Sequence, residues 1–251
     1  MLTSRTVRVR VGVLTVWAIV GIGACGQDAA EVEVPTSAPT TTLPYTVEVV
    51  GAWPLTDVAS GVAPERSGNG LDGSVGTALE ATSEGITFPA VEREPDTQRT
   101  ISIPDQPGFD VGAGEFVVSI RVRTTDAGEH NLVQHGQNDQ PTFWKVELNA
   151  NGERPGVPHC TFVGDVAAAA VAGPDRIDDG EWHTITCRHT ATKVRIEVDG
   201  ETRDNDKVTG VVANDDPLTI GGKPFCDGAD IECDYYVGVL ADLQIEVRTP
   251  R

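Results

Sequence analysis

Residues 115–124 read EFVVSIRVRT, and the alternation within this stretch decides the fold. Phe116, Val118, Ile120 and Val122 fall on one face, and Ser119, Arg121 and Arg123 fall on the other. A period of two places alternate side chains on opposite faces of a β-strand. One face is then buried and the other is in water, which is typical of antiparallel sheets. The stretch predicts an antiparallel strand packed on a core.

The same alternation recurs along the chain. Further apolar faces are predicted from Trp144, Val146 and Leu148, from Val194, Ile196 and Val198, and from Leu243, Ile245 and Val247. Asp199-Gly200 predicts a hairpin, because a type I′ turn needs a positive φ at both central residues. Residues 166–172 (VAAAAVA) have the length for two helical turns but lack caps. Many short strands predict an all-β sandwich of two antiparallel sheets.

The charge of the chain excludes one class of function. The 251 residues carry a formal net charge of -19, and the only charged residues among positions 1–24 are three arginines. The remaining chain has 16 basic and 38 acidic residues, a net charge of -22. Such a field repels phosphate backbones and anionic lipid surfaces, so we expect no nucleic-acid partner. We interpret the acidity as a well-solvated exterior rather than an acidic functional patch.

The N-terminus predicts export. Basic residues precede an apolar run of 14 residues at 11–24 (VGVLTVWAIVGIGA), too short for a membrane-spanning helix of about 20 residues. The run ends in Ile22-Gly23-Ala24-Cys25, which resembles the lipobox of bacterial lipoproteins. That resemblance implies cleavage before Cys25 and lipidation of its thiol, and two acyl chains anchor a protein stably. We expect a lipid-anchored domain outside the cytoplasm, with a transmembrane anchor as the alternative.

A linker separates the lipidated cysteine from the folded domain. Residues 35–44 read PTSAPTTTLP, in which eight of ten residues are Pro, Ser or Thr and no apolar period is present. This composition is typical of an extended tether. We therefore divide the chain into a signal peptide at 1–24, a lipidated N-terminus and disordered linker at 25–44, and one domain at 45–251.

The remaining four cysteines are expected to pair, because export places them in an oxidising compartment. Cys160, Cys187, Cys226 and Cys233 allow three connectivities. We favour Cys160–Cys187, which joins two predicted strands, and Cys226–Cys233, which closes an acidic loop (CDGADIEC). Each disulfide stabilises a domain by about 2–4 kcal/mol. The acids of the loop are expected to be exposed.

Several stretches together resemble a known family. They are WPLTD (53–57) with SGNG (67–70), FVVSIRVRTT (116–125), DGEWH (179–183) with VDG (198–200), and IGG (220–222) leading to GVLADLQI (238–245). Their order and spacing, over residues 49–247, are similar to laminin-G-like, concanavalin A-like jelly-roll domains. The resemblance implies two curved antiparallel sheets in which the first and last strands pair at the edge.

The resemblance also implies a structural calcium site near the opening loop and the final strand. The matched positions are Asp57, Asn69 and Asp242. The chain departs from the family at Thr56 and Glu65, where aspartate is common. Calcium takes six to eight oxygen ligands, so backbone carbonyls would have to complete the set. In the alternative interpretation Asn69 serves a glycine-rich turn and Asp242 faces solvent. No other cofactor is expected.

Two further kinds of site are weighed. The string Glu197-Val-Asp199-Gly-Glu201 resembles loosely the catalytic strand of glucan hydrolases. Those enzymes need two carboxylates held across the scissile bond, whereas a turn at Asp199-Gly200 places Glu201 on the next strand. We therefore expect no enzyme. His159, His183 and His189 near the cysteines fit zinc ligation, but oxidised cysteines exclude it.

A sugar site places an aromatic ring against the apolar side of a pyranose. The aromatic candidates are Tyr235, Tyr236, Phe143 and Trp144. Trp53, Trp144 and Trp182 are expected in the core, and alternation points one of the two tyrosines inward. We expect a non-catalytic, surface-anchored recognition module for a glycan or envelope polymer. A protein-binding or structural surface domain is the first alternative, and a glycoside hydrolase is the second.

Overall fold

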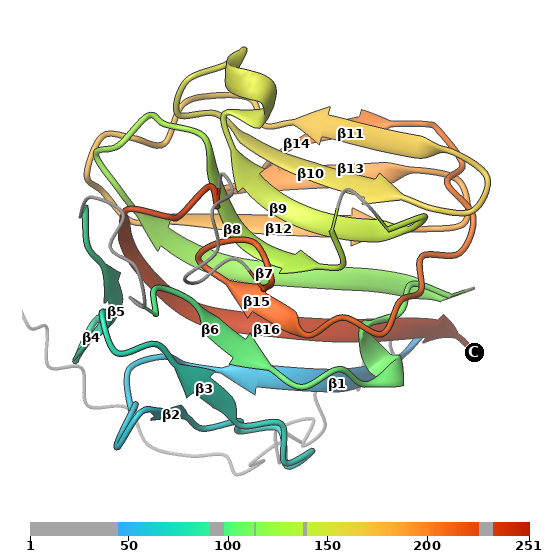
Figure 1. Ribbon diagram of the computed structural model, residues 1–251. Coiled ribbons are helices and arrows are strands. Elements are labelled where there is room, and N and C mark those ends of the chain that lie inside the picture. The colour runs from blue at the N-terminus through green and yellow to red at the C-terminus, as the bar shows by residue number, and fades with distance from the viewer. Residues whose placement is uncertain (1–44, 91–97, 113, 138–139, 226–232) are drawn as a thin grey trace, which may run out of the picture. The chain divides into compact units, whose positions relative to one another are not determined.

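The computed structural model describes residues 45–90, 98–112, 114–137, 140–225 and 233–251. They lie in one compact unit of the chain, Leu43–Arg251. Two antiparallel sheets pack face to face in a sandwich (Figure 1). The described residues form no α-helix and two 3₁₀ turns, η1 (Pro107–Phe109) and η2 (Ala150–Gly152). The predicted all-β jelly-roll sandwich is confirmed.

Sheet A contains the first and last strands. Its order is β14-β13-β12-β7-β16-β5-β4, and β1 also pairs with β16. The strands are β1 (Tyr45–Trp53), β4 (Glu80–Thr82), β5 (Gly85–Phe88), β7 (Glu115–Arg123), β12 (His183–His189), β13 (Val194–Val198), β14 (Glu201–Asn205) and β16 (Gly238–Pro250).

Sheet B contains the other strands. Its order is β11-β10-β9-β8-β15-β6-β3-β2. The strands are β2 (Val62–Ala63), β3 (Gly73–Val75), β6 (Ile101–Ile103), β8 (His130–His135), β9 (Phe143–Leu148), β10 (Pro158–Val163), β11 (Ala168–Ala172) and β15 (Leu218–Ile220).

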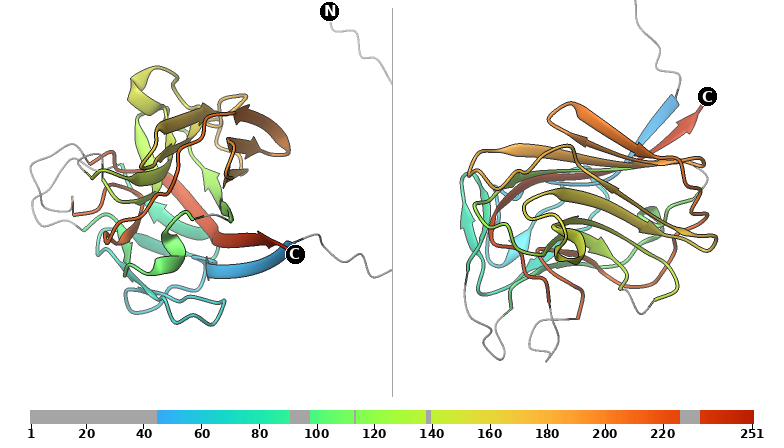
Figure 2. Two further views of the ribbon diagram at one scale, coloured as in Figure 1. Left: turned by 90° about the vertical axis from the view of Figure 1, so that its right-hand side faces the viewer. Right: turned by 90° about the horizontal axis from the view of Figure 1, so that it is seen from above.

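The pairing of β1 with β16 brings the two ends of the domain together. Tyr45 pairs with Pro250 at one end of the ladder, and Trp53 pairs with Leu243 at the other. In Figure 2 the blue β1 and the red end of β16 run side by side. This is the pairing of first and last strands that the family resemblance implies.

The core lies between the two sheets and follows the predicted alternation. On β7 the side chains of Phe116, Val118, Ile120 and Val122 are buried, while Arg121 is only half-buried on the outer face. The apolar faces predicted for the other three stretches are buried in the same core, with Val247 at its margin. Burying them removes apolar surface from water, which is the main force that holds the sheets together.

Two local predictions concern chain reversals. Asp199 and Gly200 both have positive φ, 49° and 90°, and Val198 pairs with Glu201, so the predicted hairpin turn is present. The helical alternative for residues 166–172 is wrong, because residues 168–172 form strand β11. Strand β10 supplies its hydrogen bonds, and Ala169 and Val171 pack into the core. Pairing and burial therefore outweigh the helical preference of alanine.

A disulfide joins the two sheets. Cys160 on β10 and Cys187 on β12 are bonded, with their Cα atoms 5.7 Å apart, and both are fully buried. The predicted pairing of these two cysteines is therefore present. The predicted Cys226–Cys233 disulfide involves Cys226, which lies outside the described residues, so it stays a prediction.

Candidate functional site

A pocket of about 450 Å³ opens on the outer face of sheet B. We call it the sheet B pocket. It is lined by Phe143, Lys145 and Glu147 of β9, His159 and Thr161 of β10, Ala170 and Ala172 of β11, and Ala150, Asn151 and Glu153 at η2. The strand residues point outward because Trp144, Val146 and Cys160, which alternate with them, point into the core.

A buried ion pair forms the floor of the sheet B pocket. The Lys145 ammonium lies 2.6 Å from the Glu147 carboxylate, and the two side chains are 12% and 3% exposed. The hydroxyl of Thr161, on the neighbouring strand, donates a hydrogen bond of 2.9 Å to the same carboxylate. Buried charges need such partners, because desolvation of a lone charge is costly. These contacts hold the three side chains in place.

His159 lies directly beside this pair, since it is the register partner of Glu147. Its side chain is buried, and its Nε2 atom has no hydrogen-bond partner within the described part of the chain. Burial lowers the pKa of the imidazole, and the positive charges of Arg154 and Lys145 lower it further. The imidazole is therefore neutral at pH 7 and has one nitrogen available to a ligand.

The sheet B pocket combines the groups that hold a polyhydroxylated molecule. A carboxylate accepts hydrogen bonds, an ammonium donates them, and imidazole, amide and hydroxyl groups do either. The ring of Phe143 and the methyl groups of Ala170 and Ala172 supply apolar surface beside them. Specific small-molecule sites have this composition of apolar lining and a few fixed polar groups.

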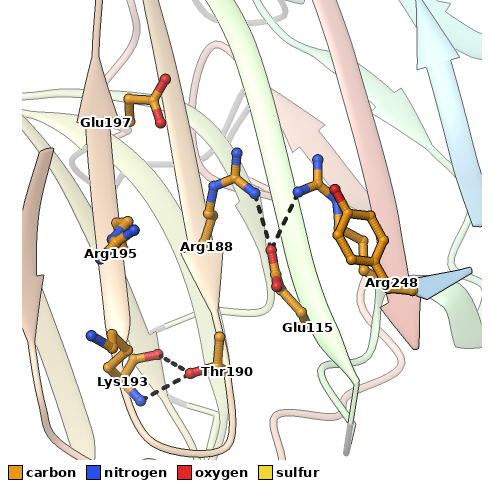
Figure 3. Close-up of a pocket in the computed structure, with 8 residues that line it drawn as sticks. Glu115, Arg188, Thr190, Lys193, Arg195, Glu197 and Arg248 are labelled. Carbon is orange, nitrogen blue, oxygen red and sulfur yellow. Dashed lines mark hydrogen bonds and ion pairs between the residues drawn. The ribbon is translucent and has the colours of Figure 1, made fainter. Parts of the chain in front are cut away.

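A second pocket, of about 350 Å³, lies on the outer face of sheet A (Figure 3). We call it the sheet A groove. It is lined by Tyr45, Glu115, Arg188, Thr190, Lys193, Arg195, Glu197 and Arg248. Figure 3 shows Glu115 of β7 between Arg188 of β12 and Arg248 of β16. One Glu115 oxygen accepts from both guanidinium groups, at 3.0 and 3.4 Å.

The other cations of the sheet A groove are also paired. Asp204 of β14 accepts hydrogen bonds from Arg195 at 2.6 Å and from Lys193 at 2.9 Å, and these two contacts hold its pKa well below the usual range. Arg248 has a second partner in Glu246, at 2.9 Å. The two pairs of Asp204 join β14 to β13 and to the residue before it, the Arg248–Glu246 pair lies within β16, and such partly exposed pairs stabilise a sheet modestly.

Comparison with known proteins places this architecture in a family. A laminin G family model, described as the concanavalin A-like lectin/glucanases superfamily, matches residues 95–250. The chain belongs to this superfamily. No curated protein sequence matches it.

Solved structures agree with this assignment of the fold. The binding domain of Paraclostridial Mosquitocidal Protein 1 is 15% identical with a TM-score of 0.55, over 81% of this chain and 49% of that one. The binding domain of botulinum neurotoxin serotype G is 14% identical with a TM-score of 0.55, over 79% and 47%. The chain thus spans about half of each of these structures or less.

One matched structure is nearly the size of this domain. Domain 4 of AbnA, an extracellular arabinanase of the GH43 class from Geobacillus stearothermophilus, was solved in complex with arabinotriose. It is 12% identical with a TM-score of 0.55, and the match covers 82% of this chain and 95% of that domain. At such identities the likeness shows the fold alone.

The two tyrosines predicted as sugar contacts have different surroundings in this superfamily member. Tyr236 is buried, and its hydroxyl donates to the Arg123 carbonyl at 2.9 Å. Tyr235 is half-buried, with the guanidinium carbon of Arg99 4.2 Å from its ring centre. The prediction that one tyrosine points inward is confirmed. Neither tyrosine lines the sheet B pocket.

The tryptophans follow the prediction in two of three cases. Trp53 and Trp144 are buried in the core. The expectation that Trp182 is a core residue is wrong, because it is half-buried at the start of β12. The guanidinium carbons of Arg121 and Arg123 lie 4.5 and 4.8 Å from its ring centre. Cation–π contacts hold this ring on the outside of sheet A.

The three positions matched to a calcium site have other partners. Asp57 forms an ion pair with Arg66, and Asp242 lies 3.0 Å from Arg121. The Asn69 amide donates to the carbonyls of residues 49 and 50, at 2.9 Å each. No group of three or more His, Cys, Asp or Glu side chains in the described ranges is placed to hold a metal. The calcium site stays a prediction.

Glu65, the other departure from the family pattern, organises the opening loop. Its carboxylate accepts hydrogen bonds from the backbone N–H groups of Ala52, Ser67, Gly68 and Asn69. Burial alone would raise the pKa of Glu65, but hydrogen bonds from Ser67, Ala52 and Asn69 outweigh it and lower the pKa to about 2. Backbone N–H groups of the opening loop therefore bind the ionised carboxylate of Glu65.

The glucanase-like string does not form a carboxylate row. Glu197 lies on β13 and Glu201 on β14, on opposite sides of the hairpin turn. Asp199 accepts hydrogen bonds from the backbone of Thr184 and from His183. The cysteines of the zinc alternative, Cys160 and Cys187, are joined to each other.

Several sequence predictions fall outside the described residues. They are the signal peptide, the lipid attachment site Cys25, the linker, and most of the acidic loop that begins at Cys226. Within the ranges that the structure describes, no helix has the length and apolar character to cross a membrane. The sheet B pocket was missed because its side chains come from three strands and a turn, and only His159 and Phe143 had been weighed as site residues.

Proposed function

We propose that this domain is a non-catalytic recognition module that binds a glycan in the sheet B pocket. The observation that carries the proposal is the Nε2 atom of His159, which is buried without a partner among the described residues beside the Lys145–Glu147 pair. A buried polar group without a partner costs about 1–3 kcal/mol. A ligand hydroxyl that pairs with Nε2 offsets this cost, so the pocket favours a polyol.

The chemistry of the pocket supports a sugar over other small ligands. Sugar hydroxyls donate and accept hydrogen bonds at once, which matches an ammonium, a carboxylate and a neutral imidazole on neighbouring strands. The structurally similar domain 4 of an arabinanase was solved with arabinotriose, which supports the ligand class. The separation of Glu197 from Glu201 by the hairpin turn supports a function without catalysis.

The proposed setting is the outside of the cell membrane. The apolar run at 11–24 and the Ile22-Gly23-Ala24-Cys25 motif support export and lipidation of Cys25. The domain would then present its pocket to glycans or polymers of the envelope. Cys25→Ser is expected to abolish incorporation of a labelled fatty acid and to release the protein from the membrane fraction. Unchanged membrane association would contradict the anchor.

A glycan array tests the proposed site, with two threonine variants that remove equivalent hydroxyls. Thr161→Val removes the hydrogen bond to Glu147 in the sheet B pocket, and Thr186→Val removes the 3.1 Å bond to Ser119 on sheet A. Loss of one hydrogen bond in the pocket lowers glycan affinity about tenfold, whereas the sheet A variant binds as wild type. A blank array, or equal affinities of the two variants, would rule out the site.

The sheet A groove favours a second candidate function, protein binding. Its arginines and glutamates alternate across neighbouring strands, as in Glu115, Arg188 and Arg248, and suit the charged side chains of a protein surface. In this case Arg188→Ala abolishes retention of one defined envelope protein on immobilised domain, and Thr161→Val retains it. If both variants retain the envelope protein, protein binding at the sheet A groove would be contradicted.

A further inference from the structure

The opening loop is joined to strand β1 by one carboxylate that accepts four backbone N–H groups. Glu65 Oε1 accepts from the N–H of Ala52, at 3.0 Å, and from that of Ser67. Glu65 Oε2 accepts from the N–H of Gly68, at 3.0 Å, and from that of Asn69, at 2.8 Å. One donor lies on β1 and three lie on the loop, so the carboxylate links the two segments. We call these four N–H groups the Glu65 nest.

Two glycines allow the loop to turn its N–H groups toward one point. Gly68 and Gly70 have φ angles of 95° and 71°, in the region that favours glycine. At both positions, no heavy atom of the described chain beyond the adjacent residues lies within 4 Å of where a Cβ atom would stand. The glycines therefore serve the backbone conformation and not close packing. Successive N–H groups in such turns form concave sites for anions.

The carboxylate in the Glu65 nest is buried and ionised. Glu65 is 8% exposed. Burial raises its pKa, but hydrogen bonds from Ser67, Ala52 and Asn69 outweigh burial and lower the pKa to about 2. A buried negative charge needs a cation or several hydrogen-bond donors, because its desolvation is costly. The backbone of the loop and of β1 supplies those donors.

Two further hydrogen bonds hold the same loop against β1. The backbone N–H of Arg66 donates to the Ala52 carbonyl at 2.8 Å. The indole N–H of Trp53 donates to the Leu71 carbonyl, also at 2.8 Å. Both ends of the glycine-rich turn are therefore fixed on β1 by groups of the protein itself.

The positions that the family resemblance matches to calcium do not form one set of ligands. Two oxygens on one calcium ion lie within about 5 Å of each other, because each is about 2.3–2.6 Å from the ion. Asn69 is bonded to the carbonyls of residues 49 and 50, whereas the backbone N–H of Asp242 is bonded to the Pro54 carbonyl. Four residues of extended chain separate the carbonyls of residues 50 and 54, a length of about 13 Å.

The polar groups at these positions are also of the wrong kind for a cation. Asp57 accepts from Nε of Arg66 at 2.8 Å, and Asp242 accepts from Arg121 at 3.0 Å. Asn69 presents its amide nitrogen, a donor, to the backbone carbonyls that would have to complete a calcium site. A calcium site surrounds a cation with oxygens, whereas this loop surrounds an anion with N–H groups.

We propose that the Glu65 carboxylate, and not a calcium ion, holds the opening loop on β1, and that the domain folds without calcium. The Glu65 nest is a site for one carboxylate, which the chain supplies itself. The proposal is independent of glycan binding in the sheet B pocket, so either can fail without the other.

Thermal unfolding of the purified protein tests the need for calcium. The midpoint is expected to be the same in excess EGTA and in millimolar calcium chloride, because a ligand stabilises a protein only if it binds the folded state. A midpoint that calcium raises by several degrees would overturn the proposal.

Chemical rescue tests the Glu65 nest. Glu65→Ala removes the carboxylate from four donors and is expected to lower the midpoint by about 10 °C. Sodium formate is expected to restore part of that loss, beyond the effect of sodium chloride at the same ionic strength, whereas calcium chloride restores none. Glu48→Ala is the matched control, because Glu48 is an exposed glutamate on the same strand. Its midpoint is expected to equal that of the wild type and to show no specific response to formate.

Each other outcome overturns the proposal. These outcomes are an unchanged midpoint of Glu65→Ala, rescue by calcium, and a response to formate no larger than that of Glu48→Ala. If Glu65→Ala does not fold, Glu65→Gln replaces it, since the amide keeps the size of the side chain and one acceptor oxygen. Its midpoint is expected to fall by about 5 °C, with no recovery in calcium. A wild-type midpoint of Glu65→Gln, or its recovery in calcium, would equally overturn the proposal.

Discussion

The outer faces of the two sheets carry similar polar residues and use them differently. On sheet A the polar groups pair with one another, as in Ser119 with Thr186 at 3.1 Å and Arg121 with Asp242 at 3.0 Å. On sheet B, the hydroxyl of Thr219 and the amide oxygen of Gln134 are buried and have no partner in the described part of the chain. Both faces are therefore polar, but they differ in whether their polar side chains have hydrogen-bond partners.

This difference separates a surface that stabilises the fold from the surface that we propose binds a ligand. Exposed cross-strand pairs each contribute a few tenths to about 1 kcal/mol, so the pairs of sheet A support the fold. Buried acceptors without partners lower stability, and proteins retain such groups where function needs them. The pairing of side chains, more than their charge or polarity, distinguishes the side of the sandwich that we propose recognises a ligand.

The largest predicted effect concerns the link between the two faces. The Cys160–Cys187 disulfide closes a loop of 27 residues, for which the chain-entropy estimate is about 3–4 kcal/mol. Cys160→Ala/Cys187→Ala is expected to lose that amount of unfolding free energy in urea titrations. Affinity for a ligand in the sheet B pocket is also expected to fall, because His159 and Thr161 flank Cys160. An unchanged unfolding free energy would show that the sheets need no covalent link.

The next effect compares one carboxylate on each face. Glu147→Gln leaves the nearly buried Lys145 ammonium unpaired and is expected to cost about 3 kcal/mol of unfolding free energy. Glu115→Gln on sheet A affects partly exposed arginines and is expected to cost less than about 1 kcal/mol. Urea titration of both variants measures the difference. Equal losses would contradict the contrast between the faces.

The smallest effect is an opposite pH dependence of two histidines. Burial, Arg154 and Lys145 lower the pKa of His159, so its contribution to stability is full above pH 6.5 and is lost as pH falls through its folded pKa. Burial opposes the shift of His183, but hydrogen bonds to Asp179 and Asp199 raise its pKa. Its contribution is full below pH 6.5 and is lost as pH rises through the folded pKa.

NMR titration of the imidazole resonances and unfolding free energies between about pH 5 and 8 measure both slopes. His159→Gln is expected to remove the loss of stability on the acid side, and His183→Gln the loss on the basic side. If both histidines changed the unfolding free energy with pH in the same direction, the contrast between them would be contradicted.

The sequence predicts the fold well because alternation is a local signal. The apolar face of β7 that the alternation predicts, Phe116, Val118, Ile120 and Val122, is the face buried in the core, and Val198 pairs with Glu201 across the Asp199-Gly200 turn. The strand at residues 168–172 is harder to predict from the sequence, because alanine occurs at both inner and outer positions of a strand. Its pairing with β10 decides the structure, and pairing is a long-range property.

The proposed binding surface cannot be recognised from the sequence for the same reason. Gln134 and Thr219 are polar residues of short strands, and nothing in the neighbouring sequence shows that both are buried. Trp182 reads as a core residue, yet two arginines of β7 hold its ring on the outside. His159 lies opposite Glu147 because of the register between β9 and β10, and this register cannot be derived from the sequence alone.

The position of the inter-sheet disulfide has a mechanical consequence. Under the proposed function, a polymer bound at His159 and Thr161 would pull on β10, and the crosslink at Cys160 would pass that tension to β12 in the opposite layer. From β12 the force continues through β7 and β16 to β1, the strand by which the chain enters the domain. The load between a polymer bound in this way and the entry strand would therefore cross the sandwich through a covalent bond and then through backbone ladders.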